Sequence, residues 1–282
     1  MTSPRNASAS RSVSDPASTR ISDLLLSKVP QVTIAFWIIK VFSTTVGETA
    51  ADYFNDTLGF GLTLTTILVG ALFLIALAVQ FATRRYTPVV YWLTVVLISV
   101  VGTLITDNLT DVVGVPLLAS TIVFSVLLAA TFTVWFLRER TLSIHSIVSR
   151  PREAFYWLAI LFTFALGTAA GDYLSEALGL GYLVAAVLFA AVIGVIAIAF
   201  FVFKANAVVC FWAAYIMTRP LGASIGDLSS APTADGGLGL GYTITSVVLG
   251  AVIIALVVYL SVRLAAQRRQ VQGSTATATV TA

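Results

Sequence analysis

The feature that most constrains this chain is an apolar segment with a single carboxylate well inside it, which occurs four times. In each copy the aspartate follows a glycine by five residues and a tryptophan by fifteen. The four aspartates are Asp52, Asp107, Asp172 and Asp227. They are 55 residues apart within each pair, and the two pairs are offset by 120 residues. These intervals indicate a duplicated unit that was duplicated again, so the four copies should pack together as one structure.

Composition places these copies in a membrane. The chain of 282 residues is 58% hydrophobic and 10% charged, with a mean hydropathy of +0.97, which is typical of a polytopic membrane protein. Its basic residues lie between the apolar spans, where they indicate membrane orientation and not nucleic-acid binding. The single cysteine, Cys210, has no Cys or His near it in the sequence, which excludes an internal disulfide and a thiolate metal cluster.

Eight apolar spans can be read along the chain, each close to the roughly 20 residues that cross a bilayer. They are residues 31–55, 60–82, 88–110, 115–137, 154–176, 181–203, 205–228 and 242–264. The predicted fold class is therefore an all-α polytopic membrane protein of eight transmembrane helices, arranged as four parallel two-helix repeats.

The same spans define a domain organisation. Residues 1–29 lack the apolar core of a signal peptide and are predicted to be a disordered cytoplasmic tail. Residues 30–137 form the first half with two repeats, and residues 138–153 a cytoplasmic linker. Residues 154–265 form the second half, and residues 266–282 a second disordered cytoplasmic tail.

Charge in the connections predicts the orientation. The connections between repeats are basic, and they hold Arg84, Arg85, Arg138, Arg140, Arg150, Arg152 and Lys204. The turns within repeats hold acids and glycines but neither Lys nor Arg. Because basic loops stay in the cytoplasm, both termini should be cytoplasmic, in a bacterial inner membrane. Each repeat then crosses the membrane twice, so the four repeats are parallel and their aspartates lie at one depth.

A carboxylate inside a membrane span costs about 2.5–3.5 kcal/mol, so it normally faces a cavity or a partner. The position four residues before each aspartate lies on the same helix face. It holds Glu48, Thr103, Thr168 and Ala223. The position four residues after it is acidic in three copies, as Asp56, Asp111 and Glu176. We expect the four aspartates and Glu48 to bind a metal ion, and we expect the two threonines and the three outer acids to form the ion pathway.

The remaining intramembrane features have simpler expected roles. Arg219, eight residues before Asp227, should either pair with one of the aspartates or act as a gate. Lys40 should extend to the cytoplasmic interface. The four aligned tryptophans, Trp37, Trp92, Trp157 and Trp212, should anchor the helices at that interface. The four aligned glycines, Gly47, Gly102, Gly167 and Gly222, should allow close helix packing.

The chemistry of the expected site suits particular ions. Carboxylate and hydroxyl oxygens without cysteine or intramembrane histidine suit hard divalent cations such as Mg²⁺, Ca²⁺ or Mn²⁺, and argue against Zn²⁺ and Cu⁺. Protons are the other expected partner, because crowded carboxyls should hold protons until a metal displaces them. No cofactor is expected. The sequence leaves the oligomeric state open.

A family resemblance suggests which ion is transported. The segments KVFSTTVGETAADYFNDTLGFGL, YWLTVVLISVVGTLITDNL, EAFYWLAILFTFALGTAAGDYL and TRPLGASIGDL resemble a bacterial family of uncharacterised membrane-anchored proteins, over residues 30–265. Some members of that family are proposed manganese exporters that depend on repeated intramembrane aspartates. The positions that match are Asp52, Asp107, Asp172 and Asp227. The resemblance implies that the transported ion is Mn²⁺.

The leading hypothesis is a secondary transporter, not an enzyme, that exports a divalent cation in exchange for protons. An intramembrane aspartyl protease is one alternative, since Gly171-Asp172 and Gly226-Asp227 resemble half of its signature. The first glycine of that signature is replaced by Ala169 and Ser224, and no tyrosine directly precedes an aspartate. The other alternative is a membrane sensor or assembly protein whose aspartates hold helices together. It would have to act without a soluble domain or a long docking loop.

Overall fold

The computed structural model describes residues 27–280, with side chains through Arg269, and this part of the chain is helical without strands. Its eight long helices are α2 (Ile34–Asp52), α3 (Gly61–Ala82), α4 (Pro88–Asp107), α5 (Leu117–Glu139), α6 (Arg150–Asp172), α7 (Tyr182–Phe201), α8 (Ala207–Ser230) and α9 (Gly241–Val280). The predicted all-α class is confirmed. Of these described helices, seven are long and apolar enough to cross a membrane. The eighth is α2, whose apolar character is reduced by Lys40, Glu48 and Asp52.

Short elements join the long ones. A π-helical turn continues three of the helices beyond their aspartates, as η1 (Tyr53–Thr57), η2 (Asn108–Val112) and η4 (Tyr173–Ala177). Two 3₁₀ turns, η3 (Ile144–Ser146) and η5 (Thr233–Asp235), lie in the connections before α6 and α9. The chain reverses at glycines with positive φ, such as Gly59 and Gly61 after η1, where a side chain would be strained.

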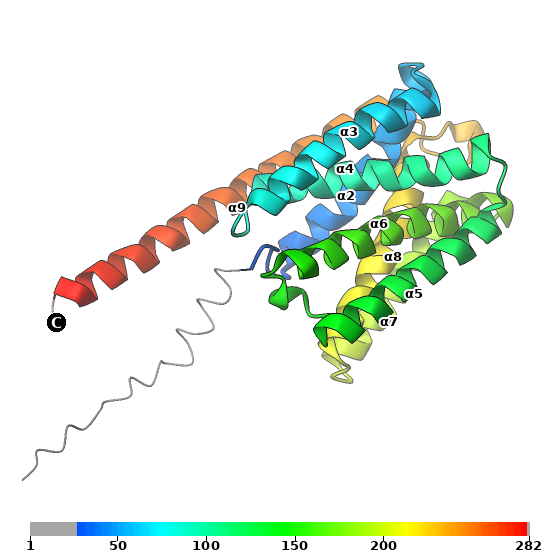
Figure 1. Ribbon diagram of the computed structural model, residues 1–282. Helices are drawn as coiled ribbons and strands as arrows, with labels where there is room; N and C mark the ends of the chain where they lie inside the picture. Colours follow the sequence, from blue (N-terminus) through cyan, green and yellow to red (C-terminus); the bar gives the residue numbers. More distant parts are fainter. Residues whose placement is uncertain (1–26, 281–282) are drawn as a thin grey trace, which may run out of the picture.

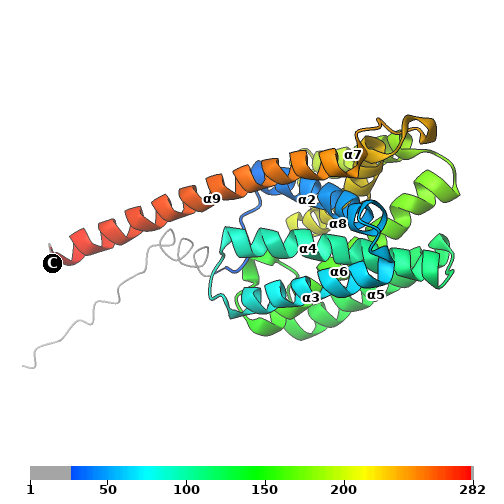
Figure 2. The ribbon, with the colours of Figure 1, turned by 90° about the horizontal axis from the view of Figure 1, so that it is seen from above.

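Four helices form an inner ring. Helix α2 packs against α4, α4 against α6, α6 against α8, and α8 returns to α2. Figures 1 and 2 show these helices running side by side through the bundle. Each carries one of the four aspartates at or near its end. The ring therefore brings the four copies of the repeated segment around a common axis.

The aligned glycines close this ring. A methyl group on Gly47 would clash with Ser99 of the next helix, and one on Gly102 would clash with Phe164. The same relation joins Gly167 to Arg219 of α8, and Gly222 to Thr44 of α2. The expected role of these glycines in close helix packing is confirmed, because at each of the four joints only a hydrogen fits.

The other four helices form an outer layer. Helix α3 packs on α4, α5 on α6, α7 on α8, and α9 on α2. Over an 18-residue apolar stretch of each helix, 67% of α4, 61% of α6 and 44% of α8 are buried, against 22% or less for α3, α5, α7 and α9. The outer helices expose many large aliphatic side chains, which suits contact with lipid. Helices α3, α5 and α7 thus each pack on the inner helix that comes next in the chain, and α9 packs back on α2.

The two ends of the described chain differ from expectation. Helix α9 continues to Val280 and extends past the bundle, beyond the expected end of the last apolar span at 264 and into the segment expected as a tail from 266. Residues 281–282 lie outside the described part. At the other end, residues 1–26 of the expected tail also lie outside it, whereas Ser27, Lys28 and Val29 are buried against the bundle. Apolar packing and the Lys28–Glu153 ion pair hold this segment in place.

The two ends of the bundle also differ in charge. We call the end with the turns between α2 and α3, α4 and α5, α6 and α7, and α8 and α9 the acidic end. The opposite end, which holds the loops 83–87, 140–149 and 202–206, is the basic end. The four aspartates lie toward the acidic end, since each is close to the turn that follows its helix.

Candidate functional site

One cavity of about 350 Å³ occupies the acidic end of the ring. It is lined by Glu48, Asp52, Asn55, Asp56, Leu62, Asp107, Thr110, Asp111, Leu117, Asp172, Glu176, Tyr182, Asp227, Ser230, Ala231 and Tyr242. Half of these residues are acidic, and no Lys, Arg or His is among them. The cavity wall therefore offers many carboxyl oxygens and no basic group, a composition that suits cations and not anions.

The four predicted aspartates all face this cavity. Each is partly exposed, in contrast to the fully buried side chains just below it on the same helix. Asp52, Asp107 and Asp172 each end an α-helix at the point where a π-helical turn begins. Such turns occur frequently at functional sites. Asp227 differs, because α8 continues without interruption to Ser230.

The three outer acids lie where the sequence placed them. Asp56, Asp111 and Glu176 line the cavity from the π-helical turns and are exposed. Asp235, in the longer connection of the fourth repeat, is also exposed but does not line the cavity. The first three therefore form an acidic rim, by which we mean these three residues alone.

The sequence reasoning missed four lining residues that begin the outer helices. They are Leu62, Leu117, Tyr182 and Tyr242, and they occupy equivalent places in the four copies. The sequence contains a signal for these positions, because the third and fourth copies share the string LGLGY, which ends at Tyr182 and Tyr242. The same positions of all four copies thus contribute to one cavity.

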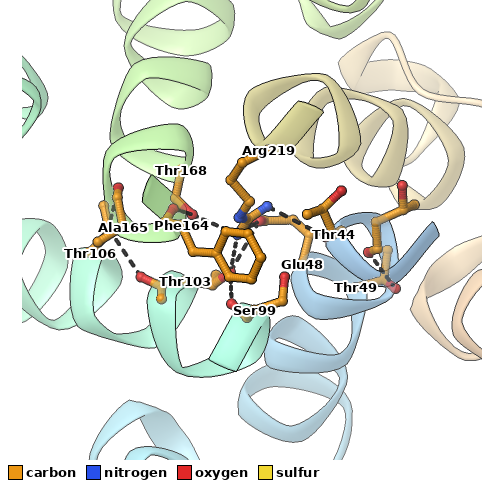
Figure 3. Close-up of polar contacts among 12 residues, drawn as sticks. Thr44, Glu48, Thr49, Ser99, Thr103, Thr106, Phe164, Ala165, Thr168 and Arg219 are labelled. Atoms are coloured by element: carbon orange, nitrogen blue, oxygen red, sulfur yellow. Dashed lines mark hydrogen bonds and ion pairs between the residues drawn. The ribbon is translucent and has the colours of Figure 1, made fainter. Parts of the chain in front are cut away.

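A layer of charged and polar side chains lies one helical turn below the cavity aspartates. Figure 3 shows the contacts within this layer. The Nη2 atom of Arg219 lies 2.7 Å from Glu48 Oε2. It also donates to the hydroxyl of Thr168 at 2.6 Å and to the hydroxyl of Thr103. The Thr103 hydroxyl donates in turn to Glu48 Oε2 at 3.2 Å. We call these four residues the arginine layer.

The arginine layer changes three predicted roles. Glu48, expected as a metal ligand, reaches the cavity wall but has one oxygen bound to Arg219. Thr103 and Thr168, expected on the ion pathway, are fully buried and bonded to the guanidinium, and they do not line the cavity. Arg219 was expected either to pair with an aspartate or to act as a gate. Its partner is Glu48 and not an aspartate, and the gating role stays a prediction. The aspartates lie one helical turn above the layer, so Glu48 is the acid closest to the guanidinium of Arg219.

A second cation lies below the arginine layer. Lys40 is fully buried, and its Nζ atom lies 4.2 Å from the centre of the Phe164 ring and 4.3 Å from that of Tyr215. It has no hydrogen-bond partner among the described residues. The expected extension to the interface is wrong, because aromatic faces hold the ammonium inside the ring by cation–π attraction.

Aromatic rings pack between the inner helices on the side of the basic end. Trp92, Trp157 and Trp212 are buried, and they pack in one cluster with tyrosines of the inner helices. At the centre of this cluster the hydroxyls of Tyr91 and Tyr156 are hydrogen-bonded. The tryptophans were expected at the membrane interface. Instead, three of the four aligned ones seal the core, because their helices form the ring and not its lipid-facing layer.

The acids do not form a compact metal site. In the part of the chain with described side chains, no three Asp, Glu, His or Cys residues converge closely enough to hold a metal ion. The cavity has room for an ion together with water, so carboxylates could act on a hydrated cation, as is common for Mg²⁺-like ions. A single metal bound directly by all four aspartates stays a prediction.

Comparison with known proteins gives a family but no activity. The family described as Repeat of Unknown Function (DUF347) matches four segments of the chain, residues 35–86, 90–141, 155–206 and 210–264. Together these segments cover most of the chain. No curated protein and no solved structure matches it.

Proposed function

This chain belongs to the DUF347 repeat family, and from that premise we propose that it is a secondary transporter that exports a divalent cation in exchange for protons. The observation that carries the proposal is the cavity, in which the same acidic position of all four repeats meets inside a ring of four helices, three of which are long and apolar enough to cross a membrane. Carboxylates inside a membrane protein are costly and usually belong to ion pathways.

The proposed topology follows the matched segments. Each segment overlaps two long helices, one of the inner ring and one of the outer layer. We take each pair as one repeat and the four repeats as parallel. The basic end carries the loop arginines, so it faces the cytoplasm of a bacterial inner membrane, and both termini lie on that side. The cavity then opens on the outer side, and the arginine layer and the aromatic cluster close the inner side.

Oxygen ligands and the charge of the cavity favour a hard divalent cation. The family resemblance makes Mn²⁺ the first ion to test. No side chain in the cavity wall is a soft ligand, so Zn²⁺ and Cu⁺ should be poorer substrates.

Export of such an ion must be coupled to an energy source. Against an inside-negative potential of about 100 mV, moving two charges outward costs about 4.6 kcal/mol. A passive pathway would mainly admit the ion. Protons entering through the same carboxylates would provide the driving force, because a carboxylate cannot hold a proton and a metal ion at the same time.

Inverted membrane vesicles that contain the protein test the proposal directly. We expect Mn²⁺ uptake into them to be driven by an interior-acid pH gradient and to dissipate that gradient. Uptake of Ca²⁺, Mg²⁺ and Zn²⁺ is measured under the same conditions for comparison. If Mn²⁺ enters equally fast without a pH gradient or a membrane potential, and no protons move in return, the mechanism is facilitated diffusion and not exchange. Absence of any ion movement would favour a sensor or assembly role. Cleavage of a membrane peptide would favour the protease.

A further inference from the structure

The arginine layer has the composition of a cation site that already contains a cation. Glu48 of α2, Thr103 of α4 and Thr168 of α6 converge on one guanidinium from three different helices (Figure 3). The backbone carbonyl of Thr44 accepts from Nη1 at 3.4 Å. The side chain of Arg219 is fully buried and that of Glu48 is 7% exposed. One carboxylate, two hydroxyls and one carbonyl are oxygen ligands that hard cations accept.

We propose that Glu48, Thr103 and Thr168 form an inner cation-binding site, which the guanidinium of Arg219 occupies in this conformation as a tethered competitor of the transported ion. The role in transport rests on the proposed function, whereas the binding site itself does not. Arg219 must leave before an ion can pass from one side of the layer to the other.

The repeats explain how the site arose. Glu48, Thr103 and Thr168 are equivalent residues, each one turn below an aspartate, and the fourth member of the set is Ala223. Three copies thus provide an oxygen ligand at this position, and the fourth provides none. The fourth copy provides the guanidinium that occupies the site, because Arg219 lies one turn below Ala223 on the same helix.

The charge balance at this level also supports the site. Glu48 is the one acid among the four equivalent residues Glu48, Thr103, Thr168 and Ala223, and Arg219 is its ion-pair partner. Withdrawing Arg219 leaves the buried Glu48 carboxylate in need of a new positive partner. A cation in the cavity would supply that partner, because Glu48 also lines the cavity wall.

Chemical rescue with guanidinium ion tests the site in detergent without any transport. The Arg219→Ala protein should lose thermal stability, and guanidinium chloride at low concentration should restore part of it, because a ligand that binds only the folded state stabilises it. Urea is a control of the same shape without charge and should not do so. Neither solute should stabilise the wild type, in which the site is filled. The Arg219→Ala/Glu48→Gln protein should lose the rescue. Equal responses to guanidinium and urea in the single variant would overturn the proposal.

A second measurement remains decisive if Arg219→Ala does not fold. In a Cys210→Ser background, Thr103→Cys places a thiol at the site while Arg219 is retained. A small cationic thiol reagent added at the acidic end should modify it slowly at rest and several-fold faster while Mn²⁺ and a pH gradient drive turnover. Modification at the same rate in both conditions, or in neither, would show that Arg219 does not leave. Transport that fails in wild-type vesicles, with guanidinium rescue intact, would reject the exporter but keep the site.

Discussion

Lys28 and Glu153 form an ion pair of 2.6 Å, although 125 residues separate them. Glu153 is fully buried, and its second oxygen accepts a hydrogen bond of 3.0 Å from Gln80. Lys28 also donates to the carbonyl of Phe81 at 3.2 Å. The segment before α2 is thereby tied to the beginning of α6 and the end of α3, so this pair locks the two halves of the chain together at the basic end.

Removing Lys28 should be costly. Lys28→Met leaves the Glu153 carboxylate buried without a counter-charge, and breaking a buried pair in this way typically costs about 3–5 kcal/mol. Arg152→Met is the matched control. Arg152 forms an ion pair with Glu139, and the two side chains are 27% and 21% exposed. Ion pairs that solvent reaches contribute about 0–1 kcal/mol to the free energy of unfolding. Thermal unfolding in detergent measures both. The double variant Lys28→Met/Glu153→Met should recover much of the loss, and equal losses in the two single variants would contradict this account.

The joints of the ring predict a contrast between glycines. Gly47→Ala should destabilise the protein by about 1–3 kcal/mol, because its methyl group meets Ser99 of α4 at a well-packed contact. Gly70→Ala in α3 is the control. No atom lies within 4 Å of the added methyl there, so the change should be neutral or stabilise the helix by roughly 0.5–1 kcal/mol. The measurement is the unfolding temperature of each variant. If both temperatures shift in the same direction, the glycines do not determine the helix contacts.

Replacing any one cavity aspartate should abolish transport. Asn keeps the shape of Asp52, Asp107 or Asp172 and removes the charge, so the protein should remain in the membrane without moving Mn²⁺. Asp227→Asn should behave in the same way, because Arg219 pairs with Glu48 and is not left without a partner. Asp235→Asn, outside the cavity, is the control and should leave the rate unchanged. Normal flux in any one of the four variants would remove that aspartate from the pathway.

The acidic rim should affect how ions arrive and leave, but not whether they cross. The triple variant Asp56→Asn/Asp111→Asn/Glu176→Gln should have a KM for Mn²⁺ raised several-fold and a nearly unchanged kcat, because exposed charges act through long-range attraction. The rate of the wild type should fall as salt is added, whereas that of the triple variant should depend less on salt. A complete loss of transport would instead place the rim among the binding residues.

The sequence predicted much of this molecule because the relevant signals are local. Except at the end of α9, the apolar spans place the helices to within a few residues, since hydropathy and length are properties of each segment alone. The repeated spacing placed the four aspartates at one level, because equivalent positions in repeats take equivalent places around an axis. The same reasoning found the acidic rim and the packing role of the glycines.

The partners of the buried charges required the tertiary structure. Arg219 pairs with Glu48 and not with an aspartate, and Lys40 lies among aromatic rings and not at the interface. Neither contact could be predicted, because a helical pattern gives the face of a residue but not which helix lies opposite. Four similar repeats increase the ambiguity, since each surface has several equivalent candidates. The order of the inner helices around the ring and the packing of α3, α5, α7 and α9 on them decide among these candidates. Only this arrangement brings Glu48 of the first repeat to Arg219 of the last, where burial makes pairing of the two charges necessary.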